Sequence, residues 1–220
     1  TLPQLWRHPD LPQAPALVAL PGYGRGELFP YSDIDVLVLL PDGDTSDAMR
    51  ASVEGFITAC WDIGLEIGSS VRSVSECVAE AKADVTVQTA LLESRFLCGT
   101  KRLFGSFKRA TGEAMDPSAF LRAKTLEMVQ RHVKYEDTPY SLEPNCKESP
   151  GGLRDLQVVM WVARAAGLGR SWSELAANGL ITPFEVKQLH RHEGTLKVIR
   201  ARLHAVARRR EDRLIFDLQT

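Results

Sequence analysis

Residues 20–40 read LPGYGRGELFPYSDIDVLVLL, and this stretch decides the fold. Its last seven residues, Ile34–Leu40, are apolar except for Asp35 and have turn residues on both sides, a pattern that predicts a buried strand. The apolar run Ala16–Leu20, where the stretch begins, predicts a second short strand. A glycine-rich turn therefore connects two strands of one sheet.

The glycine-rich turn indicates a phosphate site. Gly22, Gly24 and Gly26 follow the first strand in the segment PGYGRGE, on the way to an expected short helix. Such a turn can present several backbone N–H groups to a phosphate, and Arg25 adds a positive charge. A turn of this composition, taken alone, is also compatible with a simple chain reversal.

Two acidic residues stand at the start of the second strand. Because side chains alternate along a strand, Asp33 and Asp35 are expected on the same face, about 7 Å apart. Carboxylates this close repel each other, and hard divalent cations are their natural partners. The alternative is that Asp33 caps a turn while Asp35 pairs with a lysine. Together with the glycine turn, the acidic pair predicts metal-assisted nucleotidyl transfer.

The remaining chain predicts one more strand and then helices. Periodic apolar residues indicate a helix from about Ser46 to Gly64, and alternation indicates a strand over Leu65–Val71. Capping signals then predict further helices. These signals are Ser73 with Glu76, Asp84 at the start of a helix to Gly99, Asp116-Pro117, Ser171 with Glu174, and Thr182 with Glu185. A further helix is expected from about Asp155, after the loop 147–154. The expected fold is α+β: a small mixed β-sheet followed by an all-helical domain.

Composition excludes several classes of protein. With 44% hydrophobic and 25% charged residues in 220, the chain is an ordinary globular protein. Its net charge of −1 argues against nucleic-acid binding. No apolar run approaches the length of about 20 residues that spans a bilayer. No leader peptide is visible, and Cys60, Cys77, Cys98 and Cys146 lack metal spacing, so a reducing, cytoplasmic location is expected. The first residue, Thr1, suggests a piece of a longer chain.

The last third of the chain is basic. From Lys187 to Arg213 basic residues outnumber acidic ones. Either this segment is a solvated helix face, or it docks an acidic partner or a neighbouring domain. His190, His192 and His204 fall on a predicted helix and are interpreted as surface residues.

The motifs resemble a known family. GYGRGEL followed by SDIDVLVL resembles the signature of the DNA-polymerase-beta-like nucleotidyltransferases. More closely, the chain is similar to the bacterial PII uridylyltransferase/uridylyl-removing family. Further segments match that family in order: WDIGLEIGSSVRS at 61–73, TALLESRFLCG at 89–99, YSLEPNCKESPGGLRDLQVVMWVARAAG at 140–167 and RREDRLIFDLQ at 209–219.

The resemblance implies transfer of UMP from UTP to a tyrosine hydroxyl of the PII signal protein, with release of pyrophosphate. It implies that Asp33 and Asp35 bind Mg²⁺, and it divides the chain into a nucleotidyltransferase domain at 1–110 and a helical domain at 111–220. We take Glu66 as the third catalytic and metal-binding carboxylate, because it lies on the strand face of Ser70 and Arg72, with Asp62 as the alternative. The predicted nucleotide-binding residues are Gly22, Tyr23, Gly24, Arg25, Ser32, Arg72, Lys147 and Arg154.

Some of these assignments have alternatives. Lys147 and Arg154 lie in KESPGGLRD, which either closes over the nucleotide or is only a connector. Tyr23 and Tyr31 either stack on a base or pack in the core. No residue reveals the base preference.

Two positions depart from the family pattern. Pro21 replaces a glycine and removes one N–H from the turn, and Ser69 replaces a histidine. These departures leave open a degenerate domain that binds nucleotide or PII without catalysis, and transfer to another acceptor is a further alternative. The family's HD-type phosphohydrolase and ACT domains, expected as partners in the full-length chain, have no counterpart in these residues.

Overall fold

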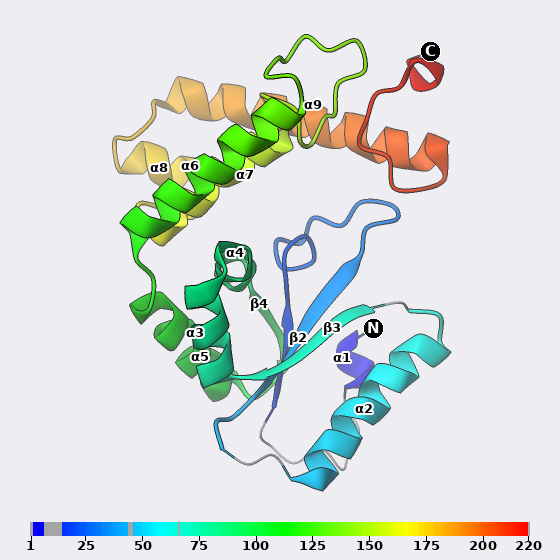
Figure 1. Ribbon diagram of the computed structural model, residues 1–220, viewed down its shortest axis with the longest axis vertical. Helices are drawn as coiled ribbons and strands as arrows, with labels where there is room; N and C mark the ends of the chain where they lie inside the picture. The colour runs from blue at the N-terminus through cyan, green and yellow to red at the C-terminus, as the bar shows by residue number, and fades with distance from the viewer. Residues whose placement is uncertain (1, 7–14, 44–45, 66, 220) are drawn as a thin grey trace. The chain divides into compact units, whose positions relative to one another are not determined.

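The protein is described by a computed structural model that covers residues 2–6, 15–43, 46–65 and 67–219. The chain forms two compact units (Figure 1). The sheet unit comprises Thr1–Leu28 and Ser32–Ala114, and the helical unit comprises Phe29–Tyr31 and Met115–Thr220. The mixed sheet followed by helices confirms the α+β prediction.

The sheet unit is built on a four-stranded mixed sheet in the order β3-β2-β1-β4. The strands are β1 (Ala16–Ala19), β2 (Ile34–Leu40), β3 (Ile67–Ser73) and β4 (Arg95–Gly99). β1 pairs antiparallel with β2 and β4, whereas β2 and β3 are parallel. A parallel pair needs a crossover connection, and α2 (Asp47–Asp62) provides it. The predicted strand over 34–40 is confirmed at both ends.

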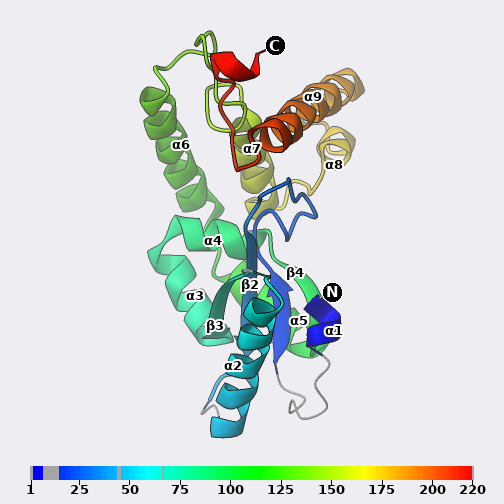
Figure 2. The same ribbon diagram turned by 90° about the vertical axis from the view of Figure 1, so that its right-hand side faces the viewer.

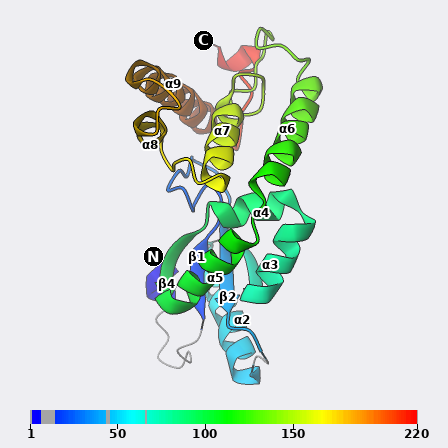
Figure 3. The same ribbon diagram turned by 90° about the vertical axis from the view of Figure 1, so that its left-hand side faces the viewer.

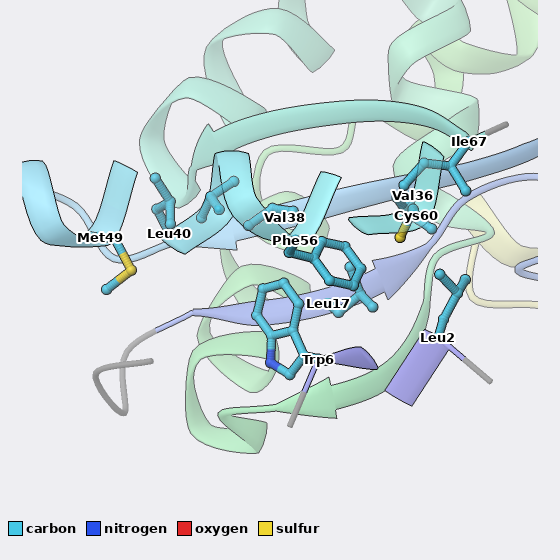
Figure 4. Close-up of a cluster of buried hydrophobic side chains, with 11 residues drawn as sticks. Leu2, Trp6, Leu17, Val36, Val38, Leu40, Met49, Phe56, Cys60 and Ile67 are labelled. Carbon is cyan, nitrogen blue, oxygen red and sulfur yellow. The ribbon is translucent and has the colours of Figure 1, made fainter. Parts of the chain in front are cut away.

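Both faces of β2 are buried. Val36 and Val38 pack with α2, whose side chain Phe56 lies in the same cluster (Figure 4). Leu37 and Leu39 pack in a second cluster with residues of α3 (Val74–Ala83) and α5 (Lys101–Glu113). These two helices lie on the side of the sheet opposite α2 (Figures 1 and 3). A strand buried on both faces reads as a continuous apolar run, which explains the sequence of β2.

Two segments of the sheet unit differ from the sequence-based prediction. The sequence analysis predicts no element in the N-terminal segment, but α1 (Leu2–Leu5) is helical, and the ring of Trp6 lies 4.9 Å from that of Phe56. The helix expected from Asp84 to Gly99 ends early: α4 spans Val85–Leu92, and β4 follows. Short apolar runs do not distinguish helix from strand, and here pairing with the edge of β1 decides for a strand.

The helical unit contains four α-helices in its described part (Figure 2). These are α6 (Pro117–Lys134), α7 (Leu153–Ala165), α8 (Trp172–Ala177) and α9 (Pro183–Ala207), followed by the 3-10 turn η1 (Phe216–Leu218). The predicted caps Asp116, Ser171 and Thr182 begin α6, α8 and α9. A full capping box forms at Thr182, and another at Ser73 before α3. At α8 the carboxylate of Glu174 instead accepts from the Arg170 N–H.

After α9 the chain turns back along the loop that precedes α7. The Cys146 N–H donates to the Asp212 carbonyl at 2.8 Å, and the Leu214 N–H donates to the Pro144 carbonyl at 2.9 Å. This return segment buries the end of α9, and His204 has no solvent exposure. The prediction that His204 is a surface residue is therefore wrong, whereas His190 and His192 are exposed.

No helix in the described part of the chain is long and apolar enough to cross a membrane. Cys60, Cys77 and Cys146 are buried free thiols, as expected of small apolar residues.

Candidate active site

The two aspartates lie where β2 begins. Asp33 is exposed and directly precedes the strand, and Asp35 is its second residue and half-buried. The Leu20 N–H donates to the Asp35 carbonyl at 3.0 Å. Because Leu20 is the last residue before the glycine-rich turn, this bond places the start of the turn beside Asp35.

Gly68 makes room for the carboxylate of Asp35. The two residues are register partners in the parallel pair of β2 and β3. A Cβ atom built at Gly68 would lie 2.2 Å from Oδ1 of Asp35, much closer than real contacts allow. The carboxylate therefore lies over the backbone of the neighbouring strand, in space that any other residue would fill. An isolated glycine inside a predicted strand is the sequence signal for such a close approach.

Several backbone N–H groups of the glycine-rich turn donate hydrogen bonds within the turn itself. The N–H groups of Gly24, Gly26 and Glu27 donate to the carbonyls of Leu20, Tyr23 and Gly22 at 2.5, 3.1 and 2.9 Å. These three N–H groups donate within the turn and hold it together. No helix follows the turn within residues 20–33, contrary to expectation.

Residues at the junction of α4 and β4 contact the glycine-rich turn. A Cβ atom at Gly24 would lie 2.4 Å from the Glu93 carbonyl oxygen, so only glycine fits there. Arg95 donates to the carbonyls of Gly24 and Tyr23 at 3.0 and 2.7 Å, and its guanidinium lies 5.3 Å from the centre of the Tyr23 ring. Tyr23 also packs against the core, which is the packing alternative considered for this residue.

Arg25 forms ion pairs inside the sheet unit. Its guanidinium contacts the buried carboxylate of Glu93 and lies 3.0 Å from that of Glu27. The Glu93 side chain is only 2% exposed, so Arg25 neutralises a buried charge. Sequence reasoning missed Glu93 and Arg95, because nothing in their local pattern reveals a partner 70 residues away.

The other predicted residues of the sheet unit are dispersed. Ser32 directly precedes Asp33 and is half-buried. Arg72 is in register with Leu39, four residues along from Asp35 or about 13 Å. There it pairs with Glu80 at 2.7 Å. Glu66 lies outside the described residues, and Asp62 is the exposed last residue of α2.

Lys147 and Arg154 lie together in the helical unit. Both contact the carboxylate of Glu148, at 3.3 and 3.1 Å. Burial lowers the pKa of Lys147 from its usual value, and the charge of Arg154 lowers it further. The side-chain oxygen of Asn145 accepts from the N–H groups of Lys147 and Glu148, which fixes the start of the loop.

Asp155 closes the same loop. Its carboxylate accepts a hydrogen bond from Arg131, another from the Gly151 N–H at 2.7 Å, and contacts His132 at 3.0 Å. Burial acts to raise the pKa of Asp155, but these hydrogen bonds outweigh it and hold the pKa below its usual value. The Pro-Gly-Gly turn is thus a rigid structure held by a charged residue of α7.

The acidic pair suits a magnesium ion shared with substrate phosphates. Among the described residues, no three His, Cys, Asp or Glu side chains are close enough together to hold a metal ion. Mg²⁺ commonly binds through one or two carboxylates, completing its shell with water and phosphate oxygens. Asp33 and Asp35 provide such oxygens, and the space over Gly68 accommodates one of them.

Comparison with known proteins identifies relatives of the chain. A small mixed sheet with a glycine-rich turn beside an acidic pair is the arrangement implied by the resemblance to nucleotidyltransferases. Residues 119–220 match the family model described as GlnD PII-uridylyltransferase. Over its whole length the chain is 60% identical to bifunctional uridylyltransferase/uridylyl-removing enzymes of Cupriavidus pinatubonensis and Burkholderia orbicola. The chain is therefore a homologue of these enzymes, which confirms the resemblance drawn from its motifs.

The matches cover the whole of this chain but only part of each curated relative. The chain spans 25% of the length of the two curated relatives. A solved toxin–antitoxin structure with AMP-PNP is 16% identical, covers 61% of this chain and 92% of its own, and has a TM-score of 0.29. Likeness at that score supports no inference.

The Arg25–Glu93 pair generates a first prediction. Arg25→Met leaves the Glu93 carboxylate buried without its cation, so we expect the free energy of unfolding to fall by about 3–5 kcal/mol. The double variant Arg25→Met/Glu93→Gln removes the charge as well and is expected to recover at least half of this loss. Urea unfolding of the three forms measures both values. If Arg25→Met is as stable as the wild type, the pair is not structural and Arg25 is available to substrate.

Asp155 generates a prediction about pH. Because its pKa is lower in the folded state, its stabilisation is present above the unfolded pKa of about 3.9 and is lost as the pH falls below it. Asp155→Asn is expected to cost about 1.5–3 kcal/mol at pH 7, and the difference should shrink by pH 3. Urea unfolding at both pH values provides the measurement, with the exposed Asp137→Asn as control. An equal difference at both pH values contradicts the assignment.

Proposed function

We propose that this chain catalyses Mg²⁺-dependent transfer of UMP from UTP to a tyrosine hydroxyl of the PII signal protein, releasing pyrophosphate. The observation that carries the proposal is the carboxylate of Asp35 lying over Gly68 at the start of β2, beside the glycine-rich turn. The identity of 60% over the whole chain supports the same activity.

The residues of the sheet unit divide the work of binding and orientation. Asp33 and Asp35 hold Mg²⁺, with Glu66 as the third carboxylate chosen from the sequence. The bound ion supplies charge neutralisation on the phosphates and lowers the pKa of the attacking hydroxyl. The turn, fixed by Arg95 and Gly24, orients the triphosphate, and Ser32 and Tyr23 lie in the segments that flank it. Orientation of this kind lowers the barrier because the reacting atoms are already aligned.

Lys147 and Arg154 are proposed as the cations that bind the nucleotide from the helical unit. Each already shares the carboxylate of Glu148, and Lys147 loses hydration through burial. Their charges are thus held in place before a phosphate arrives. The conformational entropy of these two long side chains is then lost when the loop folds rather than when the nucleotide binds.

A second candidate function is nucleotide or PII binding without catalysis. Pro21 removes one amide from the turn, and three further amides donate within it. Transfer to a different acceptor is the remaining alternative. Pyrophosphate release from each of the four nucleoside triphosphates, with and without PII, separates the candidates. Release only with UTP and PII supports the proposal, and no release in any combination favours the binding domain.

The acidic pair is tested by Asp33→Asn and Asp35→Asn. Each substitution keeps the size of the side chain and removes the charge that holds Mg²⁺, so we expect the rate of transfer to fall about a thousandfold. Stability should be unchanged or slightly higher, because repulsion between the carboxylates is relieved. Pyrophosphate release and thermal unfolding are the measurements. A variant with more than a tenth of the wild-type rate would falsify the role of its aspartate.

The glycine of β3 offers a more specific test. In Gly68→Ala the new methyl group must displace the carboxylate of Asp35, and a misplacement of about 1 Å is expected to lower the rate about a hundredfold. The matched control is Gly55→Ala in α2, where an added Cβ meets no atom within 4 Å. That control should keep full activity and gain up to about 1 kcal/mol in stability. Equal activity of both variants rules out a role for the space above Gly68.

A further inference from the structure

The segment that leads into Asp33 is anchored in the helical unit. Phe29–Tyr31 separates the glycine-rich turn from Asp33, yet these three residues pack with the helical unit rather than with the sheet. His204, fully buried near the end of α9, contacts the carbonyl oxygen of Pro30 through Nδ1. Its ring lies 6.1 Å from that of Phe29.

The ring of His204 is bound on both sides by acceptors. Its Nε2 lies 3.0 Å from Oδ1 of Asp212, while Nδ1 meets the Pro30 carbonyl. Burial acts to raise the pKa of Asp212, but hydrogen bonds from Arg200 and His204 outweigh it and hold the pKa below its usual value. The His204 ring therefore lies between a backbone carbonyl and a carboxylate.

Two cationic side chains lie beside the carboxylate of Asp212. We call the group formed by Phe29, Pro30, Arg200, His204 and Asp212 the His204 clamp. Arg200 is 8% exposed, donates from Nε to Asp212 at 2.6 Å, and stacks its guanidinium 4.2 Å from the centre of the Phe29 ring. Lys147 lies 3.9 Å from the same carboxylate. The carboxylate of Asp212 thus balances the positive charges near it. Arg200 contacts Phe29 and His204 contacts Pro30, so the clamp holds both residues.

The backbone beyond the clamp is strained. Tyr31 has a φ of 62°, in the left-handed region that non-glycine residues rarely adopt. Such a conformation is unfavourable for a residue with a side chain and persists only where the surroundings enforce it. The ring of Tyr31 is 55% exposed, so its own packing contributes little to that enforcement. The clamp contacts the residue before Tyr31, and two residues after Tyr31 the chain reaches Asp33.

We propose that His204 is a positioning residue for Asp33: by fixing the Pro30 carbonyl it holds the strained loop in the conformation that presents this carboxylate to Mg²⁺. The inference rests on the proposed function, because it takes Asp33 as a metal ligand. His204 touches no reacting atom and acts through the backbone. It also gives a role to Asp212 in RREDRLIFDLQ, a motif that the acidic site does not use.

The test compares His204→Gln with His190→Gln, an exposed histidine on the same helix, in the purified protein. For His204→Gln we expect kcat for pyrophosphate release to fall about ten- to thirtyfold and the Mg²⁺ concentration at half-saturation to rise. The KM for UTP should change less than about threefold, because the glycine-rich turn is untouched. A purely structural defect would lower stability without this division between kcat and KM. His190→Gln should match the wild type.

Two measurements need no activity. The ¹⁵N resonances of the His204 ring should show both nitrogens hydrogen-bonded, and the amides of Tyr31, Ser32 and Asp33 should exchange slowly in the wild type. In His204→Gln the exchange of these amides should accelerate at least about tenfold. A ring nitrogen without its hydrogen bond in the wild type, unchanged exchange in the variant, or unchanged kcat in a folded variant overturns the proposal. If the wild type and His190→Gln release no pyrophosphate, the proposed function fails, and the exchange data alone then decide whether the clamp exists.

Discussion

The close approach of Asp35 to the backbone of Gly68 is the constraint on which the site depends. It requires β2 and β3 to be parallel and in this register, since a slip by one residue would place Ser69 against Asp35 and turn the carboxylate to the other face. The register is fixed by burial: Val36 and Val38 belong to the α2 side, and Leu37 and Leu39 to the opposite side. The hydrophobic core thus determines where a charged group lies.

The features that were predicted correctly from the sequence are those that depend on neighbouring residues. The bounds of β2 and the caps at Ser73, Asp116 and Thr182 follow from residues within a few positions, and all were confirmed. β4 was not predicted, because its five residues become a strand only through pairing with β1. His204 was misplaced for the same reason: a helical pattern shows the spacing of residues, but not which face a returning segment will cover.

The candidate site shows the same division. Adjacent residues predicted the acidic pair and the turn, and the structure places Leu20 and Asp35 side by side. Arg25 and Arg72 are predicted from the sequence as nucleotide-binding residues, and that role stays a prediction. In the structure each has a carboxylate partner from another element, Glu93 for Arg25 and Glu80 for Arg72. Charge and proximity in sequence do not reveal such partners, since a buried carboxylate attracts the nearest cation in space.

The motifs that carry the resemblance explain one another in pairs. Glu93 and Arg95 of TALLESRFLCG lie against the glycine-rich turn, where one neutralises Arg25 and the other holds two carbonyls. In the helical unit, Asp212 of RREDRLIFDLQ receives the Cys146 N–H at its carbonyl, and Lys147 lies near its carboxylate. One motif can therefore be the structural support of another. Substitutions in these supporting motifs are expected to act through the geometry of the turn and the loop.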